Sequence, residues 1–234
     1  GAIQVGQSLG KNSLHKYLSD FGIGQNTGSH LPGESAGILH PVDQWSDSSL
    51  PTFSFGQGYS VTALQATSVF ATIANDGVRM SPTVVEGTTD STGNFASNKK
   101  AKGVRVISSD SARKVRAMLE SVVSENGTAP SAAIPGYRVA GKTGTAQRYN
   151  ESCHCYAGYT ASFIGFAPAD APRYVVSVTI QNPTGMHWGG VLGGPVFKKV
   201  MSFTLQSKGV APTSGKIETF PLTEKDLTKV ALKQ

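Results

Sequence analysis

The sequence has no long hydrophobic run and very little cysteine. No apolar segment reaches the ~18 residues that a membrane-spanning helix needs, and no signal peptide opens the chain. This argues against a membrane span within these 234 residues. The first residue is Gly1 rather than Met, so we expect a shortened or processed form of a longer chain.

The only two cysteines, Cys153 and Cys155, flank His154. Three soft ligands in a row suggest zinc, but the second pair of ligands that a structural zinc site needs is missing. A disulfide across a single intervening residue would be strained. We therefore expect the two cysteines to lie at the tip of a hairpin without metal or redox chemistry, and cysteine usage leaves the cellular compartment open.

Positive charge is in excess, but it is scattered along the chain. The formal net charge is +6 and the pI about 9.3, and the only basic cluster is Lys99-Lys100-Ala101-Lys102, with no aromatic residue among them. This pattern argues against a nucleic-acid-binding surface. A basic surface aids solubility, and it also suits work near an anionic membrane or wall polymer.

The first half of the chain alternates helical patterns with long polar segments. A length of 234 residues, 38% hydrophobic residues and a mean hydropathy of −0.15 fit a globular protein of one or two domains. Apolar spacing predicts helices over residues 2–9, 12–21, 61–75 and 109–124; Asn12 or Ser13 would cap the second, and Ser108 or Ser109 the last. Between them we expect a loop over 22–60, a strand over 80–85 and a polar turn over 87–103.

The second half switches to strand patterns. Residues 138–145, 159–166 and 173–180 predict an antiparallel meander, in which the apolar segment Tyr174–Ile180 should be covered on both faces. Pro195 would open a helix to about Leu205 that packs on the sheet through Val196, Phe197, Val200 and Phe203. Three antiparallel strands with helices to one side predict an α+β layered fold, and residues 207–234 predict a loosely held tail.

The segment Val139–Ala146 concentrates the candidate chemistry. Alternate side chains of a strand share a face, so Thr143 and Thr145 should point one way and Lys142 the other. Gly144 leaves room for a ligand or another backbone to approach closely. A strand edge with two hydroxyls, an ammonium group and free main-chain groups suits an anionic, peptide-like ligand.

A phosphate-binding loop is the first alternative for this segment. Gly136-x-x-x-x-Gly141-Lys142-Thr143 matches that motif, which needs a strand before it and a helix after it. Here a loop-like segment, Ala129–Pro135, precedes the motif, and Gly144–Tyr149 shows no helical start. The context therefore disfavours a nucleotide site.

The second alternative is a resemblance to a known family. Lys142-Thr143-Gly144-Thr145 resembles the third active-site motif of the penicillin-binding transpeptidases and β-lactamases. The likeness runs from residue 1 to about residue 206 and is closest to class B, the monofunctional cell-wall transpeptidases. It is also carried by Phe53-Ser54-Phe55-Gly56-Gln57-Gly58, Thr62-Ala63-Leu64-Gln65, Gly127-Thr128-Ala129, Phe163-Ile164-Gly165-Phe166-Ala167-Pro168, and Gly189-Gly190 before Pro195-Val196-Phe197.

The resemblance implies a fold and roles for the motif residues. Residues 1–206 would form the C-terminal part of a serine DD-peptidase/β-lactamase-like fold, with an incomplete helical subdomain. Lys142 would supply positive potential and assist proton movement, Thr143 and Thr145 would hold the substrate carboxylate, and Gly144 would line the binding strand. The backbone N–H of Thr145 would form half of the oxyanion hole. No metal or organic cofactor is implied.

The family's nucleophile is the serine of a Ser-x-x-Lys motif, and a Ser-x-Asn motif faces it. Ser-x-x-Lys occurs at Ser8, Ser13, Ser97 and Ser111, and Ser-x-Asn at Ser124. Ser111 and Ser124 belong to one predicted helix, and thirteen residues at 1.5 Å each place them roughly 20 Å apart. Because Gly1-Ala2 looks like the residues just after the family's Ser-x-Asn, we expect the nucleophile, its lysine and the second motif upstream of this chain.

By resemblance, the parent protein would cross-link peptidoglycan stem peptides at D-Ala-D-Ala by serine acyl transfer. It would bind β-lactams, act with other cell-wall or division proteins, and be held by an N-terminal anchor on the outer side of the cell membrane. This fragment alone is expected to be inactive. The alternatives are a β-lactam sensor or catalytically idle wall-binding module on the same fold and, ranked lowest, a serine β-lactamase.

Two further segments are weaker candidates. Gln57 and Gly58 would line a cleft floor or form a packed loop. His187-Trp188-Gly189-Gly190 would reach the substrate side of the sheet, or would form a Gly-rich turn with a partly buried tryptophan, which we favour.

Overall fold

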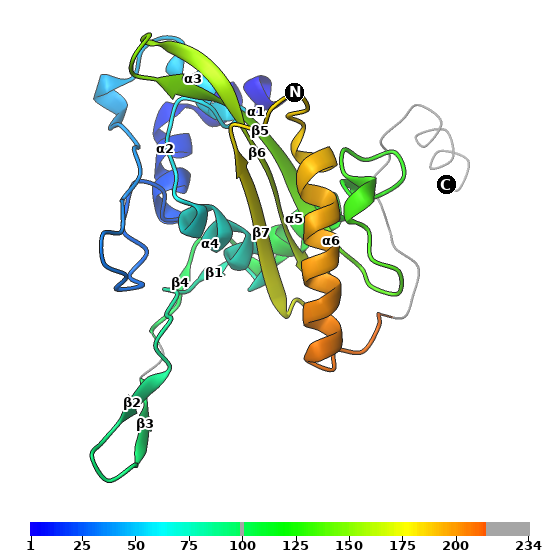
Figure 1. The fold of residues 1–234 in the computed structure, drawn as a ribbon. Helices are drawn as coiled ribbons and strands as arrows, with labels where there is room; N and C mark the ends of the chain where they lie inside the picture. Colours follow the sequence, from blue (N-terminus) through cyan, green and yellow to red (C-terminus); the bar gives the residue numbers. More distant parts are fainter. Residues whose placement is uncertain (99–100, 214–234) are drawn as a thin grey trace. The chain divides into compact units, whose positions relative to one another are not determined.

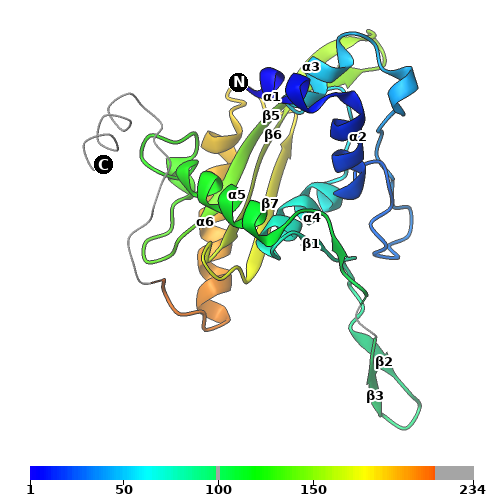
Figure 2. The same ribbon diagram turned by 180° about the vertical axis from the view of Figure 1, so that it is seen from behind.

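The computed structural model describes residues 1–98 and 101–213. Contacts divide the chain into two compact units, one formed by Gly1–Thr72 and Gly77–Ile107, the other by Ile73–Asp76 and the residues from Ser108 on. The α+β class is confirmed (Figures 1 and 2). The elements are α1 (Ala2–Leu9), α2 (Lys11–Asp20), η1 (Val42–Gln44), α3 (Ser49–Ser54), α4 (Ala63–Ala74), β1 (Val78–Arg79), β2 (Gly87–Thr89), β3 (Phe95–Ser97), β4 (Val104–Arg105), α5 (Ser109–Ser121), η2 (Pro130–Ala132), β5 (Ala140–Asn150), β6 (Cys155–Ala167), β7 (Tyr174–Gln181) and α6 (Gly189–Ser207).

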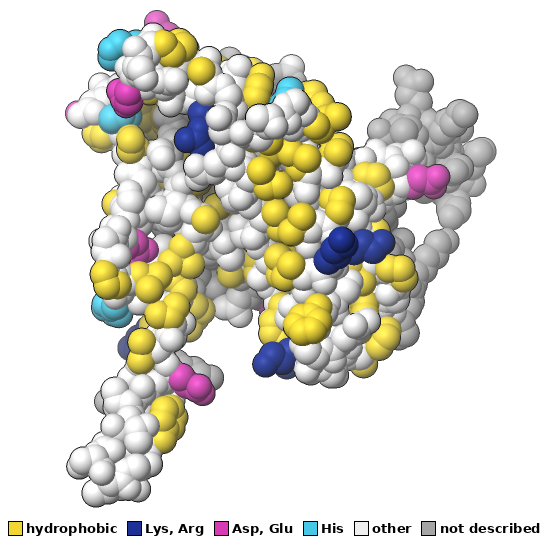
Figure 3. Space-filling view, viewed as in Figure 1, with side chains coloured by type: hydrophobic (Ala, Val, Ile, Leu, Met, Phe, Trp, Pro, Cys, Tyr) yellow, Lys and Arg dark blue, Asp and Glu magenta, His cyan; other side chains and the backbone are white. Residues whose placement is uncertain are grey.

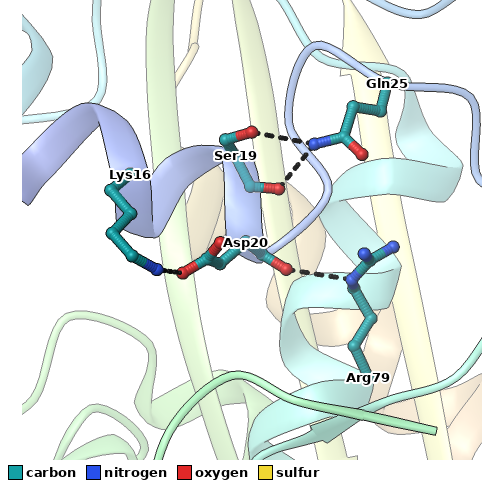
Figure 4. A network of polar contacts seen from close by, with 5 residues as sticks. All are labelled: Lys16, Ser19, Asp20, Gln25 and Arg79. Carbon is teal, nitrogen blue, oxygen red and sulfur yellow. Dashed lines mark hydrogen bonds and ion pairs between the residues drawn. The ribbon is translucent and has the colours of Figure 1, made fainter.

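The first unit begins with α1 and α2, both predicted within one residue. Capping by Asn12 or Ser13 is wrong, because α2 already begins at Lys11 and its N-cap is Gly10, at φ 80°. The C-terminal end of α2 is held by polar contacts (Figure 4). Arg79 donates from Nε to the Asp20 carbonyl at 2.9 Å, and Lys16 pairs with the Asp20 carboxylate.

The segment from 22 to 60 was expected to be a loop without secondary structure, but it contains η1 and α3. The buried side chain of Gln65, at the start of α4, organises its first part. Its Nε2 donates to the carbonyls of Gln25 and Ala36, both at 2.7 Å, and its Oε1 accepts from the Thr62 N–H at 2.8 Å. One amide thus pairs with several main-chain groups of a long loop, which explains why a loop this long is ordered.

The prediction of a strand over residues 80–85 is wrong, and so is the prediction of a polar turn without strands over residues 87–103. β1 pairs with β4, and β2 pairs with β3 in a hairpin that extends from them (Figures 1 and 2). Asp90 closes the hairpin turn, where its Oδ1 accepts from the N–H groups of Thr92 and Asn94 at 2.9 Å each. Hydrogen bonds, first of all from the Thr92 hydroxyl, lower the pKa of Asp90 to about 2.

The second unit is built on the predicted meander, with strand order β5-β6-β7. The β5–β6 hairpin carries Cys153 and Cys155 at its tip, as predicted, but the expectation against a bridge is wrong. The two cysteines form a disulfide, with their Cα atoms 5.2 Å apart. The side chains of β7 are only half-buried or exposed, because β7 is an edge strand of this three-stranded sheet; coverage on both faces is therefore also wrong.

Helix α6 lies along the sheet (Figure 1), but it begins six residues before Pro195. Its sheet-facing residues are Gly193, Phe197, Met201 and Leu205, all buried at helical spacing. Only Phe197 of the expected set therefore packs inward, where it meets Phe163 with ring centroids 4.9 Å apart. Val196, Val200 and Phe203 stay exposed, and Figure 3 shows apolar side chains gathered over this face of α6.

Helix α5 is tied to the start of β5 by a buried ion pair. Ser108 caps α5, as predicted, by accepting from the Ser111 N–H at 3.0 Å. Near the other end, the Glu120 carboxylate, only 3% exposed, accepts from Arg138 Nε at 2.8 Å and Nη2 at 2.7 Å. This bidentate pair fixes the strand that leads into the Lys-Thr-Gly segment.

Replacing Glu120 by alanine is expected to lower the free energy of unfolding by about 3 kcal/mol, because the Arg138 guanidinium loses its buried carboxylate. Asp110→Ala is the control. It removes the exposed pairs of Asp110 with Arg113 and Lys114 and should cost less than about 1 kcal/mol. Urea unfolding of both variants tests this, and equal losses would contradict a special role for the buried pair.

Candidate active site

The outer edge of β5 presents the main-chain groups of Thr143 and Thr145. Just after the end of β7, the Asn182 N–H donates to the Tyr159 carbonyl of β6 at 2.8 Å. The main-chain N–H and C=O groups of Tyr159 therefore point toward β7. The direction of the main-chain groups alternates from residue to residue along a strand. Those of Thr160, Ser162 and Ile164 therefore point toward β5, where these residues pair with Ala146, Gly144 and Lys142. The N–H and C=O groups of Thr143 and Thr145 consequently point away from the sheet.

This edge is open in the part of the chain that the structure describes, because β5 pairs there with β6 alone. The phosphate-loop alternative is wrong. Lys142 and Thr143 lie inside β5, and a strand rather than a helix follows Gly141. The space beside Gly144 is filled by Ser162, whose Oγ would lie 2.4 Å from an added Cβ.

The side chains of Thr143 and Thr145 both meet the start of α6, as expected for alternate residues of one strand. Thr145 Oγ1 accepts from the Gly189 N–H at 3.2 Å. Thr143 Cγ2 would lie 3.0 Å from a Cβ added at Gly190. Since the Thr145 hydroxyl already accepts one hydrogen bond, its own proton remains available to a ligand.

Lys142 bends back along the strand edge. Its Nζ donates to the Thr143 carbonyl and to Thr143 Oγ1, both at 3.1 Å. The ammonium group therefore reaches the same edge as the threonine hydroxyls, although its side chain starts from the opposite face. Desolvation by the surrounding protein lowers the pKa of Lys142 below its ordinary value of 10.5.

Thr128 joins this group from a different segment. Its Oγ1 lies 3.3 Å from Thr143 Oγ1, and the residue is exposed. Its carbonyl would lie 2.2 Å from a Cβ added at Gly190, and nearby Ser131 donates from Oγ to the Gly190 carbonyl at 3.0 Å. Thr128 belongs to the Gly127-Thr128-Ala129 segment of the family resemblance, and no role was predicted for it.

Aromatic side chains flank the start of α6. The rings of Tyr159 and His187 stack with centroids 4.0 Å apart, and Trp188 lies 5.0 Å from His187. Trp188 is the N-cap residue of α6 and is 58% exposed. The favoured interpretation of a Gly-rich turn with a partly buried tryptophan is therefore wrong, and this segment does reach Thr145.

Residues of the Ser-x-x-Lys and Ser-x-Asn matches make hydrogen bonds and ion pairs within their own segments. Ser8 donates to the Val5 carbonyl at 2.8 Å, and Ser124 donates to the Ser121 carbonyl at 2.7 Å. Ser111 lies 2.9 Å from the capping hydroxyl of Ser108. The lysines that follow Ser13 and Ser111 pair with Asp20 and Asp110, and Lys100 lies outside the described residues.

The weaker candidates Gln57 and Gly58 belong to the first unit of the chain. In the first unit, Gly58, at φ 84°, packs so closely on Phe53 that an added Cβ would lie 2.6 Å from its ring. In the second unit, a cavity of about 490 Å³ is lined by Arg138, Lys198 and Thr213, among others, and includes none of Lys142–Thr145. Within residues 1–98 and 101–213, no group of three His, Cys, Asp or Glu is placed to hold a metal ion, and no helix is long and apolar enough to cross a membrane.

Lys142 is expected to make the stability of the protein rise with pH. Its folded pKa lies below the 10.5 of the unfolded chain, so between the two values the unfolded state binds more protons and the free energy of unfolding increases. Urea unfolding from about pH 8 to pH 10.5 on the wild type and Lys142→Met measures this. Identical slopes for the two proteins would contradict the lowered pKa.

Gly189→Ala should disrupt the docking of α6. An added Cβ would lie 2.2 Å from the Ser162 carbonyl oxygen and 2.3 Å from that of Gly144, and backbone atoms cannot move aside cheaply. We expect a loss of about 2 kcal/mol or more in thermal or urea unfolding. Val191→Ala, at a 54% exposed position of the same helix, should change stability by less than about 0.5 kcal/mol.

Comparison with known proteins places this geometry in one family. Residues 1–202 match the family described as "Penicillin binding protein transpeptidase domain". The chain is 41% identical to penicillin-binding protein PbpB of Mycolicibacterium smegmatis in an alignment that covers 90% of this chain. It is 39% identical to stage V sporulation protein D of Bacillus subtilis in an alignment that covers 93% of this chain. It spans 34% of the length of each of these relatives.

A solved structure shows the same fold. Penicillin-binding protein 3 of Mycobacterium tuberculosis, in complex with aztreonam, superposes with a TM-score of 0.86 at 38% identity, over 95% of this chain and 51% of that one. The fold expected from the Lys-Thr-Gly resemblance is thus confirmed. The chain belongs to the penicillin-binding protein transpeptidase family, and within it to class B.

Proposed function

We propose that this chain supplies the substrate-binding strand and half of the oxyanion hole of a peptidoglycan DD-transpeptidase that β-lactams inhibit. The observation that carries the proposal is the open edge of β5. There the outward main-chain groups of Thr143 and Thr145 lie beside two hydroxyls and one ammonium group.

The edge matches a peptide that ends in a carboxylate. An extended D-Ala-D-Ala terminus can add to β5 as a further strand through the outward N–H and C=O groups. The Thr145 hydroxyl, which already accepts from Gly189, donates its proton to the terminal carboxylate, and the Thr143 hydroxyl assists. The Lys142 ammonium strengthens the attraction, since hydrogen bonds between charged groups are the strong ones.

Acyl transfer at this edge needs an oxyanion donor in place before the reaction. The outward N–H of Thr145 is held rigidly by the pairing of its neighbours Gly144 and Ala146 with β6. It can donate to the oxygen of a carbonyl that lies across the edge, where negative charge develops during attack by the serine. A β-lactam carbonyl would occupy the same position, and the acyl-enzyme would then form with loss of the lactam C–N bond.

We propose that the nucleophilic serine is none of Ser8, Ser13, Ser97 and Ser111. Support comes from the other partners of Ser8 and Ser111 and from the ion pairs of Lys16 and Lys114. We also propose that the second active-site motif belongs to a part of the parent protein outside this chain. The same holds for the N-terminal anchor that would hold the protein on the outer side of the cell membrane.

Known relatives support β-lactam and cell-wall chemistry for the parent protein. Solved structures of penicillin-binding protein 3 from Mycobacterium tuberculosis hold aztreonam or ampicillin. An Escherichia coli relative, 33% identical, is named peptidoglycan D,D-transpeptidase FtsI. We extend this to stem-peptide cross-linking, together with partners of the cell-wall or division machinery.

The intact mass of the protein before and after incubation with benzylpenicillin tests the proposal. We expect one penicilloyl adduct on the full-length parent protein, which peptide mapping should place on a serine other than the four named above, and no adduct on the 234-residue chain alone. Binding without an adduct would favour the idle wall-binding or sensor alternative. An adduct on Ser8, Ser13, Ser97 or Ser111 would overturn the placement of the nucleophile.

In the full-length parent protein, Thr145→Val is expected to lower the second-order rate of benzylpenicillin acylation by about 10- to 100-fold, because a hydrogen bond to a charged carboxylate is lost. Thr128→Val should lower it by about 3- to 10-fold, since Thr128 contacts the ligand-binding hydroxyl of Thr143 rather than acting alone. Thr179→Val, at an exposed position of β7, is the matched control. An effect of Thr179→Val equal to that of Thr145→Val would contradict the assignment.

A further inference from the structure

The tip of the β5–β6 hairpin carries chemistry that the proposed transpeptidase site does not use. Cys153 and Cys155 form a disulfide with one residue, His154, between them, and all three residues are exposed. They are the only cysteines of the chain. The bridge can therefore be reached from solvent, and it competes with no other thiol of this chain.

The bridge contributes little to holding the hairpin together. A disulfide stabilises a fold mainly by constraining the unfolded chain, and a loop of one intervening residue constrains very little. The hairpin is already closed next to the bridge, where Asn150 pairs with Cys155 and Tyr149 with Tyr156. The rings of Tyr149 and Tyr156 also meet edge to face, with centroids 6.0 Å apart.

The residue between the cysteines is held in place by a neighbour. His154 Nδ1 lies 3.1 Å from the Tyr149 hydroxyl, and His154 adopts φ 49°, which is uncommon for a residue other than glycine. The imidazole is thus held by Tyr149, and it belongs to the residue between the two cysteines. A protonated histidine beside a cysteine favours the thiolate, which is the leaving group when a disulfide is attacked.

We propose that the Cys153–Cys155 bridge is a thiol–disulfide exchange site for a dithiol reductant. A thiolate of the reductant attacks one sulfur, the Cys153–Cys155 bond breaks, and the other cysteine leaves as a thiolate stabilised by His154. The second thiolate of the reductant then attacks the mixed disulfide and releases the first cysteine. The protein gains two electrons and two protons as a pair of thiols, and the dithiol becomes a disulfide.

Reduction kinetics of the intact protein with dithiothreitol as the dithiol test this proposal. Samples are quenched with N-ethylmaleimide, and intact mass counts the alkylated cysteines in the folded protein and in urea. We expect the folded protein to be reduced within about 3-fold of the unfolded rate, because the bridge is exposed. Folded-state reduction more than about 100-fold slower would identify a structural bridge and overturn the proposal.

The role of His154 has its own readout. His154→Ala should slow reduction of the folded protein about 10-fold, because the leaving thiolate loses its neighbouring imidazole. His187→Ala, which alters the other imidazole of the same unit, is the matched control and should leave the rate unchanged. Equal rates for wild type and His154→Ala, or two free thiols in the air-oxidised protein, would contradict the proposal, and neither readout depends on acylation by β-lactams.

Discussion

The arrangement of the candidate site depends on the close approach of the α6 N-terminus to the sheet. Gly189 and Gly190 lie so near the carbonyls of Gly144, Ser162 and Thr128 that an added Cβ would come within 2.3 Å of each. Two glycines at a helix start cost helical propensity, roughly 1 kcal/mol each. That cost is accepted because the first N–H groups of a helix have no partner within the helix, and Thr145 supplies one for Gly189. The same hydrogen bond fixes the Thr145 hydroxyl as an acceptor and directs its proton outward.

The sheet could be predicted from the sequence, but the start of α6 could not. The strands carry their own signal, because β-branched and apolar residues recur throughout 159–166 and 173–180. Residues 189–194 include four glycines, which locally predict a turn, and Pro195 predicts a helix start. Contacts between Gly193 and Phe163 and between Gly194 and Ser131 override these local preferences. Pro195 has no N–H to donate to the Val191 carbonyl. It is tolerated inside the helix because Pro195 and Val191 are both exposed.

Part of the site was visible in the sequence because it is contiguous. Lys142, Thr143 and Thr145 occupy one short segment, and a motif identifies them together. Thr128 lies 15 residues from its partner Thr143, and Gly189 lies 44 residues from Thr145, so no local pattern joins them. The outward direction of the Thr145 N–H is likewise a property of the pairing register, which strand propensity does not determine. The disulfide was missed for a different reason, since ring strain was weighed without the hairpin geometry that brings the two Cα atoms to 5.2 Å.

An open edge strand is ordinarily a liability, because its free main-chain groups invite pairing with any other chain. A strand that must bind an extended peptide cannot be protected by a bulge or a proline at the binding position. In β5, Lys142 offers a different solution, since its ammonium group donates to the outward carbonyl of Thr143. A neutral strand of another protein would have to displace this charged donor and leave it without a partner, whereas a peptide with a terminal carboxylate supplies the negative charge that it needs. Under the proposed function, the lysine selects among extended ligands by charge, and the side chain that attracts the terminal carboxylate also disfavours unspecific pairing at the edge.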